Sequence, residues 1–270
     1  LSKVAEDFVV VNHIKPAVLA KVDPRQFGTV PGSSTTEALV SMVHAWNHAT
    51  DGNGATVRVV LFDFRKAFDL IDHNILLKKL RTFDICDAVI AWITDFLSSR
   101  KQRVKLGQDC FSEWGTVRAG VPQGTKLGPW LFIVMINDLN IANTELWKYV
   151  DDTTISETVP KSATSSIQSA VDSFASSAVA DKFQLNESKC REMRISFSTK
   201  DTNLDPIVVN EKEIEVVPYA KILGLNISSD LKWNAHIDFI INKCKRRIFG
   251  LRQLKCSGLG SSDLVSFFRT

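Results

Sequence analysis

The sequence has 270 residues, of which 44% are hydrophobic and 23% charged, with 13 Gly and 8 Pro. These proportions are near those of globular proteins and exclude the collagen-like, low-complexity and intrinsically disordered classes. The formal net charge of +3 permits a polyanionic partner but is too small to establish one. The five cysteines form no C-x-x-C pair, which argues against a zinc site and a disulfide framework and favours a reducing compartment.

Hydropathy gives no sign of a membrane segment. The longest apolar run covers residues 127–136 and is much shorter than the ~20 residues that a membrane span needs. No signal peptide is visible, and the sequence opens without an initiator Met. We therefore expect no membrane partner and a start inside a longer polypeptide.

Apolar periodicity predicts the elements of the first half of the chain. In order, these are a helix at 4–19, a helix capped by Thr35 or Thr36 that ends near 49, a buried strand at 58–63, and helices at 73–82 and 87–97. Strands at 102–106 and 113–117 follow, and then an apolar helix that ends near 139.

The second half begins with a predicted hairpin at 146–155. It continues with an exposed amphipathic helix at 162–182, strands at 193–198, 207–210 and 222–227, and a helix at 234–254. Because helices and strands alternate without a regular βαβ period, we expect an α+β fold with a mixed or antiparallel sheet.

Three aspartates lie where ionised groups are costly. Asp63 ends the predicted buried strand, and Asp151 and Asp152 lie at the tip of the predicted hairpin. Carboxylates in apolar strands need an opposite charge or a metal ion, and oxygen ligands suit Mg²⁺ or Mn²⁺ rather than zinc. If the two strands are neighbours, Asp63 and Asp151 can hold two ions about 3.5–4 Å apart, as in nucleotidyl transfer. An Asp-Asp pair alone, however, is more often an exposed turn or a helix cap.

The segments around these aspartates favour the metal site. FDFRKAFD at 62–69, GVPQGTKLGP at 120–129 and YVDD at 149–152 occur in order and together resemble motifs A, B and C of reverse transcriptases. The wider context resembles non-LTR (LINE-type) retrotransposon polymerases of the jockey-like kind, at FDLIDH (68–73), INDL (136–139) and KYVDDTT (148–154). The resemblance covers essentially the whole chain and implies a right-hand polymerase: partial fingers at 1–57, a palm with interleaved fingers segments at 58–230, and the start of the thumb at 231–270.

The resemblance implies metal-binding and catalytic roles at matching positions. Asp63 and Asp151 would ligate both metals, assisted by the backbone carbonyl of Phe64, and Asp152 would complete the acidic cluster. Lys189, in the motif D-like stretch 185–189, would protonate the leaving pyrophosphate. An exposed loop lysine is the structural alternative for Lys189.

The same resemblance implies a dNTP site. Phe68 matches a steric gate that excludes the 2′-hydroxyl, and Lys66 with the amides of Ala67 and Phe68 matches positions beside the triphosphate. Gln123 and Gly124 match the pocket for dNTP and template, with Thr125 where many relatives have Ser. Without the motifs, Phe68 would be interpreted as a core aromatic residue.

Residues 221–227 resemble motif E, the primer grip, a hairpin in which Lys221 and Gly224 would support the primer end. The predicted C-terminal helix carries an excess of basic residues, among them Lys243, Arg246 and Arg247. These would contact phosphates of the template–primer duplex, as in a thumb. The structural alternative for the motif E-like stretch is that Leu223 and Leu225 are simple sheet core. The structural alternative for the C-terminal helix is a solvated face.

The sequence thus predicts an RNA-directed DNA polymerase that acts in retrotransposition. The resemblance implies Mg²⁺ or Mn²⁺ as cofactor and an RNA template, a DNA primer and dNTPs as partners, at nuclear and cytoplasmic locations. An endonuclease, the remaining fingers and a full thumb would belong to the rest of a larger polyprotein. We therefore expect weak activity from this stretch alone.

Three alternatives stay open at this point. A group II intron or retron reverse transcriptase shares the palm but fits the flanks 72–73 and 148–154 less well. An RNA-directed RNA polymerase is disfavoured by Phe68 at the gate. A decayed or domesticated fragment would only bind nucleic acid, although intact Asp63, Gln123, Asp151 and Asp152 argue against random decay.

Overall fold

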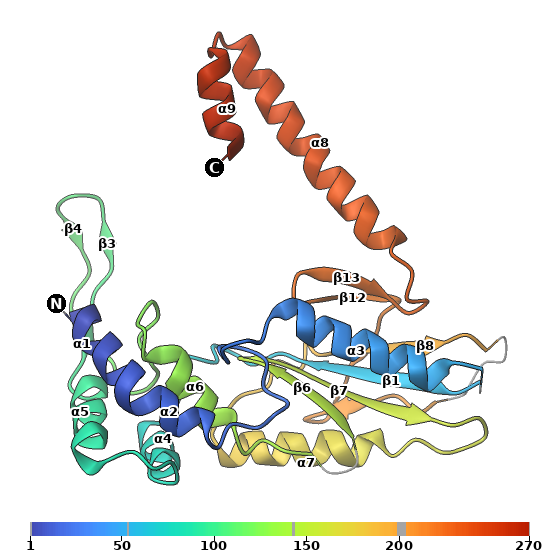
Figure 1. Ribbon diagram of the computed structural model, residues 1–270, viewed down its shortest axis with the longest axis horizontal. Coiled ribbons are helices and arrows are strands. Elements are labelled where there is room, and N and C mark those ends of the chain that lie inside the picture. Colours follow the sequence, from blue (N-terminus) through green and yellow to red (C-terminus); the bar gives the residue numbers. More distant parts are fainter. Residues whose placement is uncertain (1, 53, 142–143, 199–203, 270) are drawn as a thin grey trace. The chain divides into compact units, whose positions relative to one another are not determined.

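The computed structural model describes residues 2–52, 54–141, 144–198 and 204–269 (Figure 1). The chain forms two compact units, Leu1–Val216 and Val217–Thr270. The boundary between them precedes the motif E-like stretch 221–227, so that stretch lies in the same unit as the C-terminal helix.

A mixed sheet is the centre of the first unit. The described strands take the order β11 (Glu215–Val216), β8 (Arg191–Ser196), β1 (Thr56–Phe62), β7 (Asp152–Val159), β6 (Glu145–Tyr149). All neighbours are antiparallel except β11 and β8, which are parallel. The central strand β1 is buried along almost its whole length, which explains its continuous apolar, β-branched sequence. The predicted α+β class and mixed sheet are confirmed.

The pairing of β1 with β7 determines which residues meet at the end of the sheet. Phe62 lies opposite Thr153 in this antiparallel register. One step beyond the last pair, the same register sets Asp63 opposite Asp152. The two strands are therefore neighbours, as the metal-site hypothesis requires.

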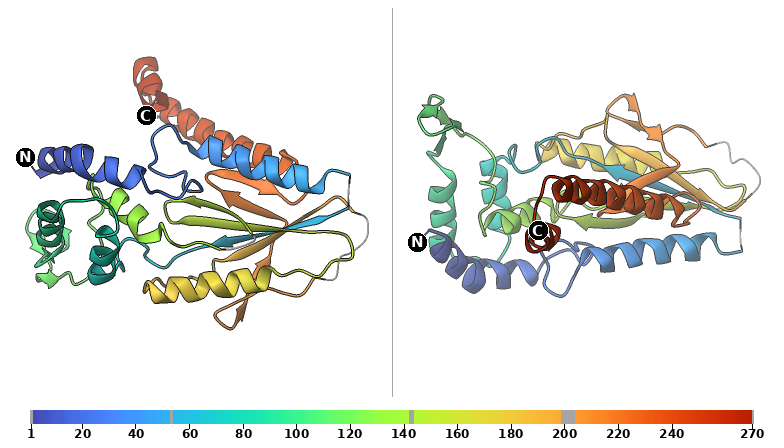
Figure 2. Two further views of the ribbon diagram at one scale, coloured as in Figure 1. Left: turned by 60° about the horizontal axis from the view of Figure 1, so that its bottom comes forward. Right: turned by 90° about the horizontal axis from the view of Figure 1, so that it is seen from above.

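One helix covers each face of the sheet (Figure 2). On one face α3 (Thr35–Thr50) packs its Trp46 against Trp147 of β6. Its N-cap is Ser34, whose Oγ accepts a hydrogen bond from Glu37 N, and not Thr35 or Thr36 as expected. The chain enters the helix one residue earlier because Ser34 has the extended backbone of a cap.

On the other face lies α7 (Ile167–Ala180), where Phe174 stacks on Phe62 with ring centroids 4.2 Å apart. The predicted amphipathic helix is present over a shorter range, with its polar side exposed. Its apolar stripe is buried against the sheet and comprises Ile167, Ala170, Val171, Phe174 and Ala178.

The remaining helices of the first unit gather at one end of the sheet (Figure 1). They are α1 (Ser2–Val9), α2 (Lys15–Leu19), α4 (His73–Leu80), α5 (Asp87–Leu97) and α6 (Gly128–Ile136). The predicted helix at 4–19 is helical but contains a π-helical segment, η1 (Val10–Ile14). Helix α6 is buried on almost every side, in keeping with its apolar sequence.

Several predicted strands are interrupted. The expected strand at 102–106 splits into β2 (Lys101–Gln102), paired with β5 (Gly115–Thr116), and β3 (Lys105–Leu106), paired with β4 (Cys110–Phe111). Near the end of the first unit, β9 (Val208–Val209) pairs with β10 (Lys212–Glu213).

The second unit contains one hairpin and two helices. The hairpin that the resemblance to motif E implied is present, formed by β12 (Tyr219–Ile222) and β13 (Leu225–Ser228), and the single strand that the apolar pattern predicted at 222–227 is wrong. Leu223 and Gly224 form its turn with φ of 45° and 92°, the left-handed conformation of a tight two-residue hairpin loop. Helix α8 (Asn234–Cys256) confirms the predicted helix, and α9 (Ser261–Arg269) is a helix that the sequence pattern did not reveal.

All five cysteines are free. No described helix combines the length and the apolar character needed to cross a membrane.

A buried lysine joins the sheet to the helical end of the first unit. The Lys148 side chain is 1% exposed, and its Nζ lies 2.7 Å from Asp23 Oδ2. The same ammonium donates to the carbonyl oxygens of Ile136, Asn137 and Leu139 at the end of α6. Burial lowers the pKa of Lys148. Burial alone would raise the pKa of Asp23, but hydrogen bonds from Arg25 and Lys148 outweigh it and the pKa is lowered.

Replacement of Lys148 by methionine should destabilise the fold by about 3 kcal/mol, because Asp23 would keep only Arg25 as a cation and three carbonyl oxygens at the end of α6 would lose their donor. Urea unfolding measures this loss. Lys182→Met is the matched control: its Nζ lies 2.7 Å from Asp72, but the Lys182 side chain is 63% exposed, and we expect less than about 1 kcal/mol. Equal losses in the two variants would contradict the structural role of Lys148.

Candidate active site

The carboxylates converge where β1 ends and β7 begins. Asp63 follows the last residue of β1, Asp152 is the first residue of β7, and Asp151 lies in the turn between β6 and β7. Val150 in this turn has φ of 57°. A β-branched residue in the left-handed region is strained, so neighbouring groups must hold the turn.

Residues 25–28 supply that support. The side-chain oxygen of Gln26 accepts hydrogen bonds from Val150 N at 3.1 Å and from Gly28 N at 2.8 Å. Phe27 N donates to Lys148 O, and Lys148 N donates to Arg25 O, so the segment runs alongside β6. A Cβ on Gly28 would lie 2.6 Å from Val150 Cγ2, so only glycine fits. Gln26 and Gly28 could not be recognised from the sequence, because they precede Val150 by more than a hundred residues.

A second segment supports the chain after Asp63. Asn186 N donates to Asp63 O at 2.7 Å, and Arg65 N donates to Gln184 O at 2.8 Å. These two hydrogen bonds form an isolated antiparallel bridge between Phe64 and Leu185, and the carbonyl of Phe64 takes no part in them. Because successive carbonyls of an extended chain point to opposite sides, the Phe64 carbonyl is directed toward the other edge of the strand, where β7 lies. The geometry therefore fits the predicted metal-ligating role of Phe64.

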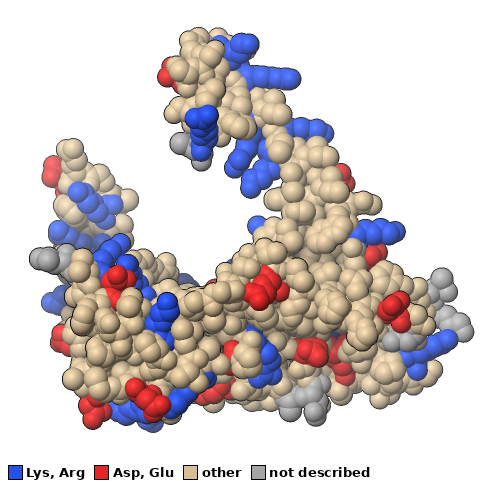
Figure 3. Space-filling model, viewed as in Figure 1, with Lys and Arg blue, Asp and Glu red and all other residues tan. Residues whose placement is uncertain are grey.

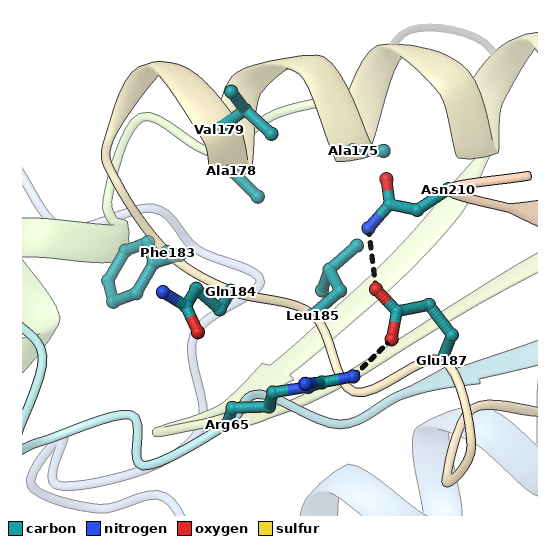
Figure 4. Close-up of a pocket in the computed structure, with 9 residues that line it drawn as sticks. All are labelled: Arg65, Ala175, Ala178, Val179, Phe183, Gln184, Leu185, Glu187 and Asn210. Carbon is teal, nitrogen blue, oxygen red and sulfur yellow. Dashed lines mark hydrogen bonds and ion pairs between the residues drawn. The ribbon is translucent and has the colours of Figure 1, made fainter.

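Figure 4 shows how the loop that carries Lys189 is held. Glu187 accepts hydrogen bonds from Arg65 at 2.6 Å and from Asn210 at 2.9 Å. These residues border a pocket that is also lined by α7. The hydrogen bond from Asn210 is the main reason that the pKa of Glu187 is lowered. Lys189 Nζ lies 3.7 Å from Asp63 Oδ2, so the structure brings this predicted residue to the carboxylates.

The carboxylates repel one another. Asp152 retains exposed surface, yet partial burial and the nearby charges of Asp151 and Asp63 raise its pKa above the usual value. Asp63 Oδ2 is shielded from water and has no hydrogen-bond partner among the described residues. A buried carboxylate oxygen without a donor, next to two further carboxylates, is a donor set that fits a hard divalent cation.

The described carboxylate side chains do not form a chelating arrangement in this structure. Within residues 2–52, 54–141, 144–198 and 204–269, no three acidic, histidine or cysteine side chains lie in an arrangement that could hold a metal ion.

The turn after Asp63 is joined to the glycine-rich segment. Val121 N donates to Phe68 O, and Gln123 Nε2 donates to Asp69 Oδ1 at 3.2 Å. A Cβ on Gly120 would lie 2.5 Å from Asp69 O, which explains the glycine at this close approach. The joined segments border a cavity of about 500 Å³, lined among others by Lys66, Asp69 and Gln123.

The other predicted dNTP residues lie on the same two segments. Phe68 is half-buried and stacks on Phe132 of α6 with ring centroids 4.5 Å apart, so one ring face belongs to the core. Ala67 is buried and Lys66 is exposed. Gly124 has φ of 77° and open space where a Cβ would be. Its backbone is therefore accessible to a ligand.

The predicted nucleic-acid residues all lie in the second unit. Lys221 is exposed on β12, and Gly224 is in the tight turn. Lys243, Arg246 and Arg247 are exposed on α8, and their spacing of three and four residues puts them on one side of the helix. Lys and Arg side chains are numerous along this helix (Figure 3).

Asp152→Asn should stabilise the protein in the absence of divalent cations. Because the folded state raises the Asp152 pKa, the ionised carboxylate opposes folding at pH 7 and not at pH 3, where it is protonated. The gain should not exceed about 1 kcal/mol, since contact with water screens the repulsion. Thermal unfolding in EDTA at both pH values tests this, with the exposed Asp172→Asn as control. A less stable Asp152→Asn variant at pH 7 would contradict the proposed repulsion.

Comparison with known proteins agrees with this geometry. Residues 4–227 match the family described as reverse transcriptase (RNA-dependent DNA polymerase). Curated relatives include the RNA-directed DNA polymerases from mobile element jockey of Drosophila melanogaster, 28% identical over 251 residues, and of Drosophila funebris, 25% identical over 260 residues. These alignments cover 88% and 92% of this chain but 27% and 28% of those proteins. The chain spans about a quarter of the length of these relatives.

Solved structures show the same fold. Telomerase from Candida tropicalis in complex with a TWJ fragment of telomeric RNA aligns with a TM-score of 0.57 at 13% identity, over 84% of this chain and 38% of that chain. The apo telomerase aligns with a TM-score of 0.56 at 13% identity, over 86% and 41%. The palm-type polymerase fold and the jockey-like resemblance expected from the motifs are confirmed, and the chain belongs to the reverse transcriptase family.

Proposed function

We propose that this chain is the polymerase core of a non-LTR retrotransposon protein and extends a DNA primer on an RNA template. The observation that carries the proposal is the convergence of Asp63, Asp151 and Asp152 from neighbouring strands. The chain's own contribution is to hold these carboxylates next to the joined turns of 65–72 and 120–124.

Mg²⁺ or Mn²⁺ is the proposed cofactor, held by Asp63, Asp151 and the carbonyl of Phe64, with Asp152 completing the negative charge. Bound divalent ions would activate the primer 3′-hydroxyl and stabilise the charge that develops on the phosphates. Asp63 Oδ2 accepts no hydrogen bond from the described residues and has only Lys189 as an ion-pair partner, at 3.7 Å. This and the raised Asp152 pKa support the assignment, because a bound divalent cation would stabilise both carboxylates.

The incoming dNTP is proposed to occupy the cavity between the two turns. Lys66 has φ of 47°, so the backbone there forms a tight bend, and the amides of Ala67 and Phe68 follow it. These amides and the Lys66 ammonium suit a triphosphate. Phe68 would exclude a 2′-hydroxyl, and Gln123 with Gly124 would position the base pair. Lys189 would hold the proton that is donated to pyrophosphate.

The nucleic-acid partners are proposed to be the RNA template and the DNA primer. Lys221 and Gly224 would support the primer end, and Lys243, Arg246 and Arg247 would contact phosphates. Because the longer jockey proteins extend well beyond the aligned part, we propose an endonuclease and completed fingers and thumb as further parts of the same polyprotein.

The exposed basic side of α8 favours a second candidate function. A chain that has lost catalysis would still bind nucleic acid through such a surface. Metal dependence separates the two functions, because phosphate contacts by lysine and arginine need no divalent ion.

Primer extension on an RNA template with Mg²⁺ and dNTPs tests the polymerase. We expect weak extension that Asp151→Asn reduces at least about 100-fold, because it removes a charge that acts on the reacting groups. Asp172→Asn, on the exposed side of α7, should keep wild-type extension. Metal-dependent dNTP binding is the parallel readout. RNA binding without metal-dependent dNTP binding and without extension would favour the binding module.

Phe68→Ala should reduce the preference for dNTPs over rNTPs by at least about tenfold, measured as the ratio of kcat/KM values on one template. It should also destabilise the fold by about 2 kcal/mol, since the ring stacks on Phe132. Phe132→Leu disturbs the same stack but keeps the Phe68 ring and should retain sugar preference. An unchanged ratio in folded Phe68→Ala would assign Phe68 to the core alone.

A further inference from the structure

An exposed hairpin that precedes the glycine-rich turn at 120–124 has no role in the chemistry described so far. It covers residues 100–118 and is called here the basic hairpin. Strands β2 and β5 form its stem, β3 and β4 form its tip, and it projects beyond α5 (Figure 1). Every residue from 101 to 116 is exposed. A two-stranded hairpin without a core is only marginally stable, so packing does not explain its composition.

The composition is basic and aromatic. Lys and Arg side chains lie over this part of the surface (Figure 3). The basic residues are Arg100, Lys101, Arg103, Lys105 and Arg118, and the acidic residues are Asp109 and Glu113. The hairpin thus has a net charge of +3, equal to the formal net charge of the whole chain. Such a concentration of charge complements a polyanion.

Cations and rings share one surface of the basic hairpin. The Arg103 guanidinium lies 4.0 Å from the ring centroid of Phe111 and 4.6 Å from that of Trp114. Lys105 Nζ lies 5.4 Å from the Phe111 centroid. The Trp114 side chain is nevertheless 58% exposed. Exposed rings beside cations bind unpaired nucleic acid, because bases stack on the rings while phosphates meet the charges.

The stem of the basic hairpin borders the proposed dNTP cavity. Arg100, Gln102 and Val117 line the same 500 Å³ cavity as Lys66 and Gln123. Arg100 also donates to Gly120 O at 2.6 Å, which fixes the stem to the glycine-rich segment. A strand that leaves the cavity on this side meets the stem first and the aromatic tip next.

We propose that the basic hairpin binds single-stranded RNA, with bases stacked on Phe111 and Trp114 and phosphates at Arg103 and Lys105. The bound strand is the unpaired template that has not yet reached the cavity. This identification of the strand rests on the proposed polymerase function, whereas binding of unpaired RNA by the hairpin does not.

Fluorescence anisotropy with the complete chain tests the binding. The probes are a labelled 12-nucleotide oligouridylate and a labelled 12-base-pair RNA duplex, without divalent ions. The double variant Phe111→Ala, Trp114→Ala should weaken single-strand binding at least about tenfold, because stacking is lost, and change duplex binding less than twofold. Since both side chains are exposed, the melting temperature should stay close to that of wild type. Phe197→Ala, an exposed aromatic residue outside the hairpin, is the matched control.

Two results would overturn the binding site: unchanged single-strand affinity in the double variant, or equal losses for single strand and duplex, which would indicate a charged surface without stacking. Asp151→Asn should keep single-strand binding whether or not it loses extension, so failure of the polymerase proposal is seen separately. In an active chain, the double variant should impair extension on templates with a ten-nucleotide 5′ overhang more than on templates with one. Equal impairment would assign the bound RNA to something other than the incoming template.

Discussion

The antiparallel pairing of β1 with β7 is the constraint on which the carboxylate site depends. Its register determines that the residue after Phe62 faces the residue before Thr153, and both are aspartates. Repulsion between such groups opposes folding and, together with the larger effect of burial, raises the pKa of Asp152. A protein keeps an arrangement of this kind only when other interactions stabilise the backbone on which it stands.

Those interactions come from outside the reacting groups. Gln26 accepts a hydrogen bond from the amide of Val150, Glu187 fixes the loop that follows α7, and Lys148 connects β6 to the end of α6. Each uses a hydrogen-bonded or ionised side chain, so each fixes direction as well as distance. Stability and chemistry thus rest on different groups: the supporting contacts hold the backbone around the site, and the three aspartates are left for the chemistry.

The sequence was most informative where local pattern and fold agree. The alternation at 146–155 and the apolar run at 58–63 predicted both strands of the site, and the motifs around Asp63 and Asp151 predicted the family. Long-range polar contacts could not be predicted. A lysine in an alternating strand is ordinarily solvent-facing, and nothing near Lys148 in sequence indicates that Asp23 will pair with it.

Other differences arose where tertiary context overrode local preference. Leu223 is an unusual residue for a tight turn, so residues 222–227 resembled one strand. The tip of the basic hairpin is exposed and has no core of its own, so the expected strand at 102–106 divides into two short strands.

The contact between Gln26 and Val150 has a consequence for how the chain is made. These residues are 124 positions apart, so Gln26 has no partner until the whole segment between them has been synthesised. At the usual rates of translation, the emerging Gln26 waits roughly 6–25 s for Val150. The hydrogen bond then closes a long loop, which is entropically costly. The turn that carries Asp151 is therefore completed late, and a nascent chain becomes competent only after most of the first unit has left the ribosome.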